Sequence, residues 1–309
     1  SGIYQWRPEW CKSQFSYDEA KVKLDLPFQS FKEAFANDIK TMVIGVVNAG
    51  GTLSDRWKRS IIEAIKSGLN IASGMHTRLS DVPEILDAAE KYGVNLYDLR
   101  FSNQTFSTGK GSKRSGKRLL TVGTDCSVGK KYTALAIEKA MKENAFKCEF
   151  KATGQTGVLI AERGIAIDAI VSDFVSGAVE WLSPDNDSDH WDIIEGQGSL
   201  FHPSFAGVSL GLLHGSQPDA IILCHEPTRT NMRGVDTSIP SIQECIDENI
   251  RLGKLTNPNI RCIGVALNTS DMNSDSKELK SKISKENNLP CFDPLTDDLS
   301  QIIDEIRNI

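Results

Sequence analysis

A glycine-bracketed turn, GTDCSVGKKYT, follows the apolar run RLLTV and precedes a helical pattern. In a phosphate-binding loop, a strand leads through such a turn into a helix N-terminus. Backbone N–H groups and the helix dipole then attract an anion, and a lysine adds positive charge. Lys130 occupies the position of that lysine. We therefore predict that the turn binds the phosphates of a cofactor through Gly123, Thr124, Asp125, Cys126, Ser127, Val128, Gly129, Lys130, Lys131, Tyr132 and Thr133.

This loop differs from that of a nucleotide hydrolase in two respects. Five residues separate its glycines where four are usual, a longer form that resembles the loop of dethiobiotin synthetase, an ATP-dependent ligase. Lys131 stands where a hydroxyl would coordinate Mg²⁺, and Thr133, two positions later, points elsewhere around the helix. Adjacent lysines suit a metal-free polyanion such as the phosphates of coenzyme A. An ATP/Mg-dependent ligase or kinase remains the alternative.

A second polar cluster begins after the apolar run WDII. Glu195 falls at the predicted carboxyl end of a strand, where open α/β sheets bind ligands. We predict Glu195, His202 or Asp173 as the catalytic acid or base, with Glu195 favoured narrowly over His202. Asp173 also fits the first turn of a helix. The histidines lack the short i, i+4 spacing of a zinc motif, so we predict no metal.

Cationic and imidazole side chains follow in the same region, at Arg229, Arg233 and His214. Arginine binds carboxylates in a bidentate manner, so this set is predicted to bind the substrate. Each of these residues taken alone has an ordinary structural interpretation. Because several such residues follow neighbouring strand ends, we interpret the group as a substrate-binding site.

The composition is that of a globular protein, with 309 residues of which 39% are hydrophobic and 25% charged. A net charge of -6 argues weakly against binding to nucleic acid, and the sequence has no apolar stretch of membrane-spanning length. Seven cysteines, an odd number without CxxC spacing, indicate reduced thiols and a cytoplasmic location. We also expect a homo-oligomer.

Short Val- and Ile-rich runs alternate with helical patterns, which predicts two parallel α/β domains. The first, residues 1–108, is predicted to be small and Rossmann-like. Its strands are expected at 41–51, 69–76 and 94–100, with one helix capped by Ser54 and another by an Asp81–Glu84 capping box. The second, residues 118–309, is predicted to be a dethiobiotin-synthetase-like P-loop domain. Its strands are expected at 118–124, 148–154, 191–198, 219–226 and 260–268, and its helices at 130–143, 241–252, 276–286 and 299–307.

A basic segment, GKGSKRSGKR, separates the two predicted domains. Its composition is typical of a solvated linker, assigned to residues 109–117. The alternative is that some of Lys110, Lys113, Arg114 and Lys117 reach phosphates bound by the second domain.

Three long motifs together carry a family resemblance: GTDCSVGKKYTALA, ATGQTGVLIAERGIAIDAIVSDFVSGAVE and EGQGSLFHPSFAGVSLGLLHGSQPDAIILCHEPTR. They resemble a bacterial and archaeal family long catalogued as a domain of unknown function and now associated with D-glutamate (D-amino-acid) N-acetyltransferases. WRPEW, NAGGTLSDRW and SGMHTRLSDVPE resemble the first domain of the same family. The resemblance implies a Rossmann-like domain followed by a P-loop domain.

The same resemblance implies that acetyl-CoA binds at the loop and donates its acetyl group to the amino group of a D-amino acid, D-glutamate above all, within D-amino-acid catabolism. It assigns no catalytic residue. Besides the ATP/Mg alternative, a non-catalytic nucleotide-sensing module remains open. The dense polar set from Glu195 to Arg233 favours an enzyme.

Overall fold

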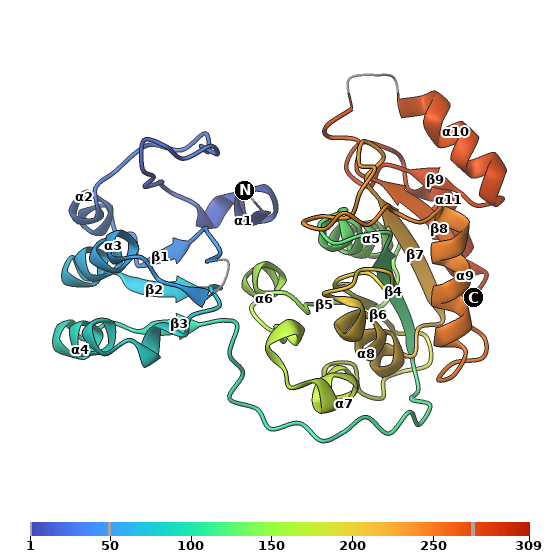
Figure 1. Cartoon of the computed structure of the whole chain (residues 1–309), viewed down its shortest axis with the longest axis horizontal. Coiled ribbons are helices and arrows are strands. Elements are labelled where there is room, and N and C mark those ends of the chain that lie inside the picture. The colour runs from blue at the N-terminus through green and yellow to red at the C-terminus, as the bar shows by residue number, and fades with distance from the viewer. Residues whose placement is uncertain (1, 49–50, 273–275) are drawn as a thin grey trace. The chain divides into compact units, whose positions relative to one another are not determined.

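A computed structural model describes residues 2–48, 51–272 and 276–309 (Figure 1). The chain divides into two compact units, Ser1–Asn103 with Val158–Glu162, and Gln104–Gly157 with Arg163–Ile309. Each unit contains one sheet whose strand pairs are all parallel. Within the described ranges, no helix combines the length and the apolar character that crossing a bilayer requires. The α/β fold class predicted from the sequence is confirmed.

The first unit has a three-stranded sheet in the order β1-β2-β3, formed by β1 (Thr41–Ile44), β2 (Asn70–Ser73) and β3 (Leu96–Asp98). Helices α3 (Asp55–Lys66) and α4 (Pro83–Tyr92) connect these strands and contact each other. The buried core combines apolar side chains of the helices, such as Ile65 and Ile85, with Ile71 of the central strand. The helical segments of this unit are α1 (Gly2–Trp6), α2 (Phe31–Ala36), α3 (Asp55–Lys66), α4 (Pro83–Tyr92), and the 3₁₀ turns Pro8–Trp10 and Leu79–Asp81.

Different local signals determine where the two long helices of this unit begin. Ser54 caps α3 as predicted, because its side chain accepts a hydrogen bond from Trp57 N–H. The capping box predicted between Asp81 and Glu84 is wrong, since Val82 is the N-cap of α4 and makes no side-chain cap. Pro83 explains the difference: proline suits the first helical position, so α4 begins there without a polar cap.

The apolar run at 41–51 forms a shorter and less buried strand than predicted. The strand ends at Ile44, and Val43 is 40% exposed. Val47, beyond the strand, is also exposed. Part of the glycine-containing end, residues 49–50, lies outside the described residues.

The second unit has a six-stranded sheet in the order β5-β6-β4-β7-β8-β9. Its central strand, β4, leads into the predicted phosphate loop and lies between β6 and β7. The strands are β4 (Lys117–Gly123), β5 (Cys148–Lys151), β6 (Trp191–Ile194), β7 (Ala220–His225), β8 (Arg261–Leu267) and β9 (Cys291–Phe292). Because the strands are parallel, their carboxyl ends share one edge of the sheet, and that edge carries the loop and Glu195.

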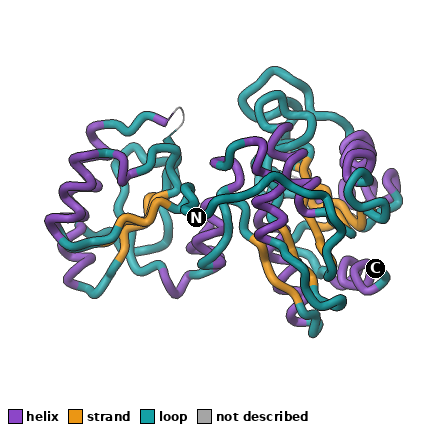
Figure 2. The backbone as a smooth tube through the Cα atoms, turned by 90° about the horizontal axis from the view of Figure 1, so that it is seen from below, coloured by secondary structure: helices purple, strands orange, loops and turns teal. Residues whose placement is uncertain are grey.

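Helices cover both faces of this sheet (Figure 2). On one face, Leu223 belongs to a core cluster with residues of α7, α8 and α9. On the other, the neighbouring Cys224 contacts Thr133 of α5. Adjacent residues of a strand point to opposite faces, so α5 and these helices lie on opposite sides. The helices of this unit are α5 (Lys130–Glu143), α7 (Val175–Leu182), α8 (Ala206–Ser216), α9 (Ile242–Gly253), α10 (Ser276–Asn287) and α11 (Ser300–Arg307), with 3₁₀ turns Ile167–Ala169 and Ser172–Phe174. Helix α6 (Gln155–Ala161) is divided between the units, because the segment Val158–Glu162 belongs to the first.

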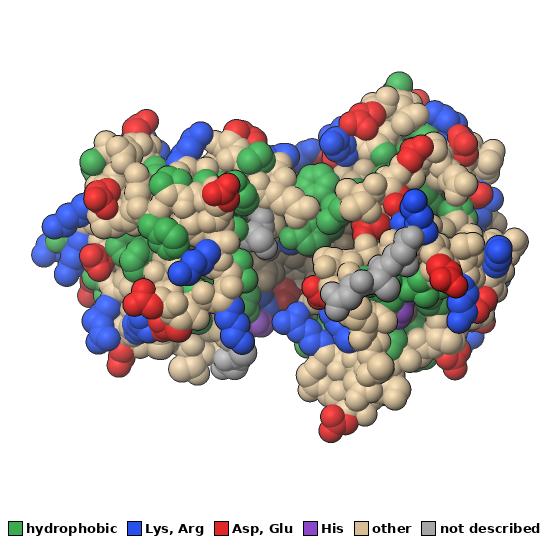
Figure 3. All heavy atoms as spheres, turned by 90° about the horizontal axis from the view of Figure 1, so that it is seen from above, with side chains coloured by type: hydrophobic (Ala, Val, Ile, Leu, Met, Phe, Trp, Pro, Cys, Tyr) green, Lys and Arg blue, Asp and Glu red, His purple; other side chains and the backbone are tan. Residues whose placement is uncertain are grey.

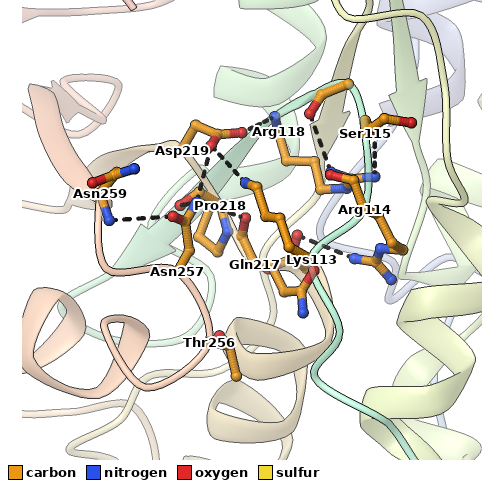
Figure 4. A network of polar contacts seen from close by, with 12 residues as sticks. Lys113, Arg114, Ser115, Arg118, Gln217, Pro218, Asp219, Thr256, Asn257 and Asn259 are labelled. Atoms are coloured by element: carbon orange, nitrogen blue, oxygen red, sulfur yellow. Dashed lines mark hydrogen bonds and ion pairs between the residues drawn. The ribbon is translucent and has the colours of Figure 1, made fainter.

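The basic segment before β4 is bound to the second unit along much of its length (Figure 4). Lys113 pairs with Asp219 at 3.0 Å, and the buried Arg114 donates to the carbonyl oxygen of Gly215 at 2.6 Å. Both partners precede β7 in the chain and lie at the sheet edge opposite the loop. Since β4 has seven residues, about 20 Å separates the two edges, and Lys113 and Arg114 are too far away to reach a phosphate at the loop.

Acidic and basic side chains are intermixed on both units, on the face drawn in Figure 3.

Candidate active site at the phosphate loop

The loop joins β4 to α5 with the geometry of an anion-binding turn. Lys130 opens the helix and is buried, and its Nζ donates to the carbonyl oxygen of Asp125 at 2.7 Å. Burial lowers the pKa of Lys130. Ser127 and Gly129 have left-handed φ values of 56° and 104°. Successive turns of this kind gather backbone N–H groups into a concave anion site.

The side chains near the position of the usual Mg²⁺-binding hydroxyl do not have the arrangement of a metal ligand. Thr133 is 1% exposed; its hydroxyl donates to the carbonyl oxygen of Gly129 at 3.2 Å and accepts from the thiol of Cys224 at 3.4 Å. The hydroxyl therefore faces the sheet. Burial lowers the pKa of Lys131, against the opposing effect of Glu195. A cation thus occupies the position where a nucleotide hydrolase has its metal ligand.

Glu195 follows β6 directly and lies buried at the same edge as the loop. Its Oε2 accepts hydrogen bonds from the N–H groups of Thr153, at 3.0 Å, and Gly154, at 3.1 Å. Burial raises the pKa of Glu195 to about 7, against the effects of Lys131, these two N–H groups and Lys130. A carboxyl group with this pKa changes protonation state near neutral pH, which suits a general base.

Two glycines make room for this carboxylate, and a third lets the backbone after it approach β4. A Cβ at Gly157 would lie 2.2 Å from Glu195 Oε2, and one at Gly154 would lie 3.1 Å from Oε1. At Gly196 a Cβ would lie 1.6 Å from the carbonyl oxygen of Thr121. Glu195 and the strand beside it therefore pack against backbone that tolerates no side chain.

Arg229 and Arg233 are engaged with the loop itself. Arg229 Nη1 forms an ion pair with Asp125 Oδ2 at 2.7 Å, and the backbone N–H of Arg233 donates to the same oxygen at 2.8 Å. Burial opposes ionisation of Asp125, but the hydrogen bonds from Arg233, Arg229 and Cys126 outweigh it and lower the pKa of this carboxyl. The predicted contact of the two arginines with substrate gains no support from this arrangement.

His202 is buried close to this cluster but makes two hydrogen bonds of its own. Its Nδ1 accepts from Ser204 N–H at 3.1 Å, so the proton belongs on Nε2, which lies 3.1 Å from the carbonyl oxygen of Arg233. Both ring nitrogens are therefore occupied. This favours Glu195 over His202 as the base.

The other two predicted residues lie apart from the loop. The side chain of Asp173 is exposed on the 3₁₀ turn before α7, and among the described residues no hydrogen bond or ion pair joins it to Glu195. His214 is on α8, with Nε2 3.2 Å from the carbonyl oxygen of Leu252 on α9. Because α8 leads back toward the start of β7, His214 lies nearer the opposite edge of the sheet.

Several residues of this region were not singled out from the sequence. Thr153 donates from its hydroxyl to the carbonyl oxygen of Glu195 at 2.5 Å and accepts from Gln197. His225 ends β7 with Nδ1 3.0 Å from Thr124 Oγ1, and burial lowers its pKa. Thr153 and His225 each lie at the end of a predicted strand, and this position is the feature of the sequence that could have identified them. Cys126, in contrast, has its pKa raised by burial and by Asp125, which disfavours a thiolate nucleophile.

Comparison with known proteins identifies the family. The P-loop domain of the DUF1611 family, a domain of unknown function, matches residues 105–303, and the family's Rossmann-like N-terminal domain matches residues 18–102. The chain belongs to the DUF1611 family. A crystal structure of a DUF1611 family protein from Anabaena variabilis is similar, with a TM-score of 0.85 and 30% identity over 92% of this chain and 84% of that one.

Two relatives carry a functional name. A D-glutamate N-acetyltransferase from a Pseudoalteromonas species is 50% identical over 303 residues, which cover 97% of this chain and 91% of the relative. A D-glutamate N-acetyltransferase from Tritonibacter scottomollicae is 43% identical over 314 residues, which cover 100% of this chain and 93% of the relative. The family resemblance is confirmed, and this member of the family is an enzyme, an N-acetyltransferase.

Proposed function

We propose that the protein transfers the acetyl group of acetyl-CoA to the amino group of D-glutamate, as a step of D-amino-acid catabolism. The acceptor is the one named for both relatives. One observation carries the mechanism: a buried carboxyl group with a pKa of about 7, Glu195, lies at the sheet edge that also bears a phosphate loop. The base and the anchor for the donor are thereby close to each other.

The reaction requires a neutral amine. Glu195 in its carboxylate form accepts a proton from the ammonium group of D-glutamate, and the freed nitrogen attacks the thioester carbon. A C–N bond forms and the C–S bond breaks. The nitrogen loses its second proton, which the CoA thiolate takes up as it leaves, and Glu195 then releases the first proton to solvent. Oε1 is the oxygen that we assign to this proton transfer, because Oε2 already accepts from Thr153 and Gly154.

The loop anchors the donor in this proposal. Backbone N–H groups of the loop and of the first turn of α5, with Lys130, would hold the CoA phosphates. Lys130 now donates to a loop carbonyl and would turn toward the anion. The inward orientation of Thr133 and the cation at Lys131 favour this metal-free cofactor over ATP with Mg²⁺.

An acetylation assay with D- and L-glutamate as acceptors tests the proposal. We expect acetyl transfer from acetyl-CoA to D-glutamate, with the L enantiomer poorer. Isothermal titration should detect CoA binding, which Lys130→Ala should weaken. Binding of ATP–Mg²⁺ together with no binding of CoA would instead support the ligase alternative.

Replacement of the proposed base gives the first quantitative prediction. We expect Glu195→Gln to lower kcat by about 100- to 1,000-fold, because general-base catalysis contributes a factor of this order. In the unaltered enzyme kcat/KM should rise with pH through about 7, where Glu195 loses its proton, and this rise should be absent from the variant.

The matched control is Glu248→Gln, whose partly exposed carboxylate pairs with Arg251 on α9. It should keep the full rate and the full pH profile. Unchanged activity of Glu195→Gln would show that another group accepts the proton.

A further inference from the structure

Ser127 has an unusual backbone conformation in the middle of the loop. Its φ of 56° lies in the left-handed region, which is unfavourable for a residue with a side chain. Such a conformation persists only where the surroundings impose it. At Ser127 the surroundings are two arginines, since Arg229 Nη2 donates to its carbonyl oxygen at 3.3 Å and Arg233 Nη1 donates to its Oγ at 2.6 Å.

Arg229 binds two consecutive carbonyl groups of the loop. Its guanidinium donates to the carbonyl oxygens of Cys126, at 2.9 Å, and Ser127, at 3.3 Å. In a trans peptide, the C=O and the following N–H point in opposite directions. Turning the carbonyls of Cys126 and Ser127 toward Arg229 therefore turns the N–H groups of Ser127 and Val128 away from it, to the side on which we place the anion.

Asp125 fixes the position of the guanidinium group. Its carboxylate is fully buried and accepts from Arg229 Nη1, from Arg233 N–H and, at 2.7 Å, from Cys126 N–H. Arg229 thus bridges a buried anion and two loop carbonyls. A lysine could balance the charge of Asp125, but its single ammonium lacks the planar fork that makes these contacts together.

We infer that Arg229 is a positioning residue, which with Asp125 and Arg233 holds the phosphate loop in its anion-binding shape and does not bind the amino-acid substrate. This inference rests on the proposed function, because the anion it names is the phosphate of CoA. It predicts that replacing Arg229 weakens binding of the cofactor and does not change binding of D-glutamate.

Arg229→Lys is the direct test, since it keeps the charge opposite Asp125 and removes the fork. We expect the KM for acetyl-CoA and the Kd for CoA to rise about tenfold, the effect of losing one charge-assisted hydrogen bond. The KM for D-glutamate should stay within about twofold of its original value. Arg251→Lys is the matched control, because Arg251 forms an equally close pair with Glu248 on α9 and should change neither constant.

A second substitution separates loop shape from other effects. Glycine adopts left-handed φ without penalty, so Ser127→Gly removes the need to hold this residue in place. The reference for this test is the Ser127→Gly variant itself, whose Kd for CoA is measured first. The double variant Ser127→Gly, Arg229→Lys should bind CoA within about threefold of it, a partial rescue that a contact with substrate would not produce.

Arg233→Ala provides an independent check, because the Arg233 side chain is exposed and its loss leaves no buried charge unpaired. It should weaken CoA binding by about threefold, a smaller loss than that from Arg229→Lys. Unchanged CoA binding by Arg229→Lys and Arg233→Ala, or a larger rise in the KM for D-glutamate than in that for acetyl-CoA, would overturn the inference. Absence of CoA binding by the unaltered protein would overturn the proposed function, and the inference with it.

Discussion

Glu195 combines two properties that work against each other. As a base it must ionise near neutral pH, yet it is buried where ionisation is unfavourable. Two backbone N–H groups and two neighbouring lysines partly offset the cost, so that its pKa rises only to about 7. The carboxylate that the reaction needs is therefore a source of instability in the folded protein.

This cost predicts a pH-dependent gain in stability for Glu195→Gln. Since the folded pKa of Glu195 is raised above the ordinary value of 4.5, the folded state binds more protons than the unfolded state between pH 4.5 and about 7. Below pH 4.5 Glu195 is protonated in both states and does not lower the free energy of unfolding. As the pH rises from 4.5 toward 7, the free energy of unfolding falls, because Glu195 ionises more readily in the unfolded state. At pH 8 the penalty is about 3 kcal/mol, which glutamine avoids while still accepting from Thr153 and Gly154.

Thermal denaturation of the two proteins between pH 4 and 8 measures this effect. The variant should melt above the unaltered protein at pH 8, and the difference should shrink as the pH falls. A difference that is constant across this range would show that Glu195 titrates alike in the folded and unfolded states.

At the scale of elements, glycines decide how closely the segments around the site approach one another. The loop after β6 passes so near β4 that a Cβ at Gly196 would collide with the backbone of Thr121. Gly207, in the first turn of α8, has open space instead. The same substitution should therefore have opposite effects at these two positions.

We expect Gly196→Ala to destabilise the protein by about 3 kcal/mol, the upper part of the range for overpacking, because only backbone movement could relieve the clash. Gly207→Ala should be neutral or should stabilise by up to about 1 kcal/mol, since alanine is the better helix former. Urea denaturation of both variants measures the difference. Equal stability of the two would mean that β4 and the β6 loop separate readily.

The sequence predicted most strands and amphipathic helices of the fold, because their periods and caps are local. It did not predict α8, whose sequence AGVSLGLLHGS is apolar on all sides and rich in glycine, so that no periodicity marks it. It also missed β9, which has two residues. The capping box failed because Pro83 determined where α4 begins.

The candidate site was only partly predictable for a related reason. The loop and the strand-end position of Glu195 are local features, and both were found. The partner of Arg229 is Asp125, which lies 104 residues earlier in the chain. No spacing in the sequence connects them, so the arginine appeared to be free for a substrate.

At the scale of the whole molecule, each unit has its own hydrophobic core. Ile65 is fully buried in the first and Ile221 in the second, and the two clusters share no residue among those described. Each core buries side chains of its own sheet and helices. We therefore expect a cavity in one core to loosen mainly the unit that contains it.

Ile65→Ala should cost about 3 kcal/mol and speed amide hydrogen exchange in β1, β2 and β3. Ile221→Ala should do the same in β4, β6 and β7. Mass spectrometry of peptides from each unit measures both effects, and each variant serves as the control for the other. Equal acceleration in both units would show that they unfold together.

The bound segment before β4 has a consequence for where the second unit can be cut from the chain. Lys110 and Gly111 donate their N–H groups to Glu180, and Ser115 donates to Asp185. A truncation starting at Arg118 would remove all these donors together with the side chain of Arg114. An autonomous second unit therefore has to start upstream, near Gln104, and what resembles a tether is a structural edge of that unit.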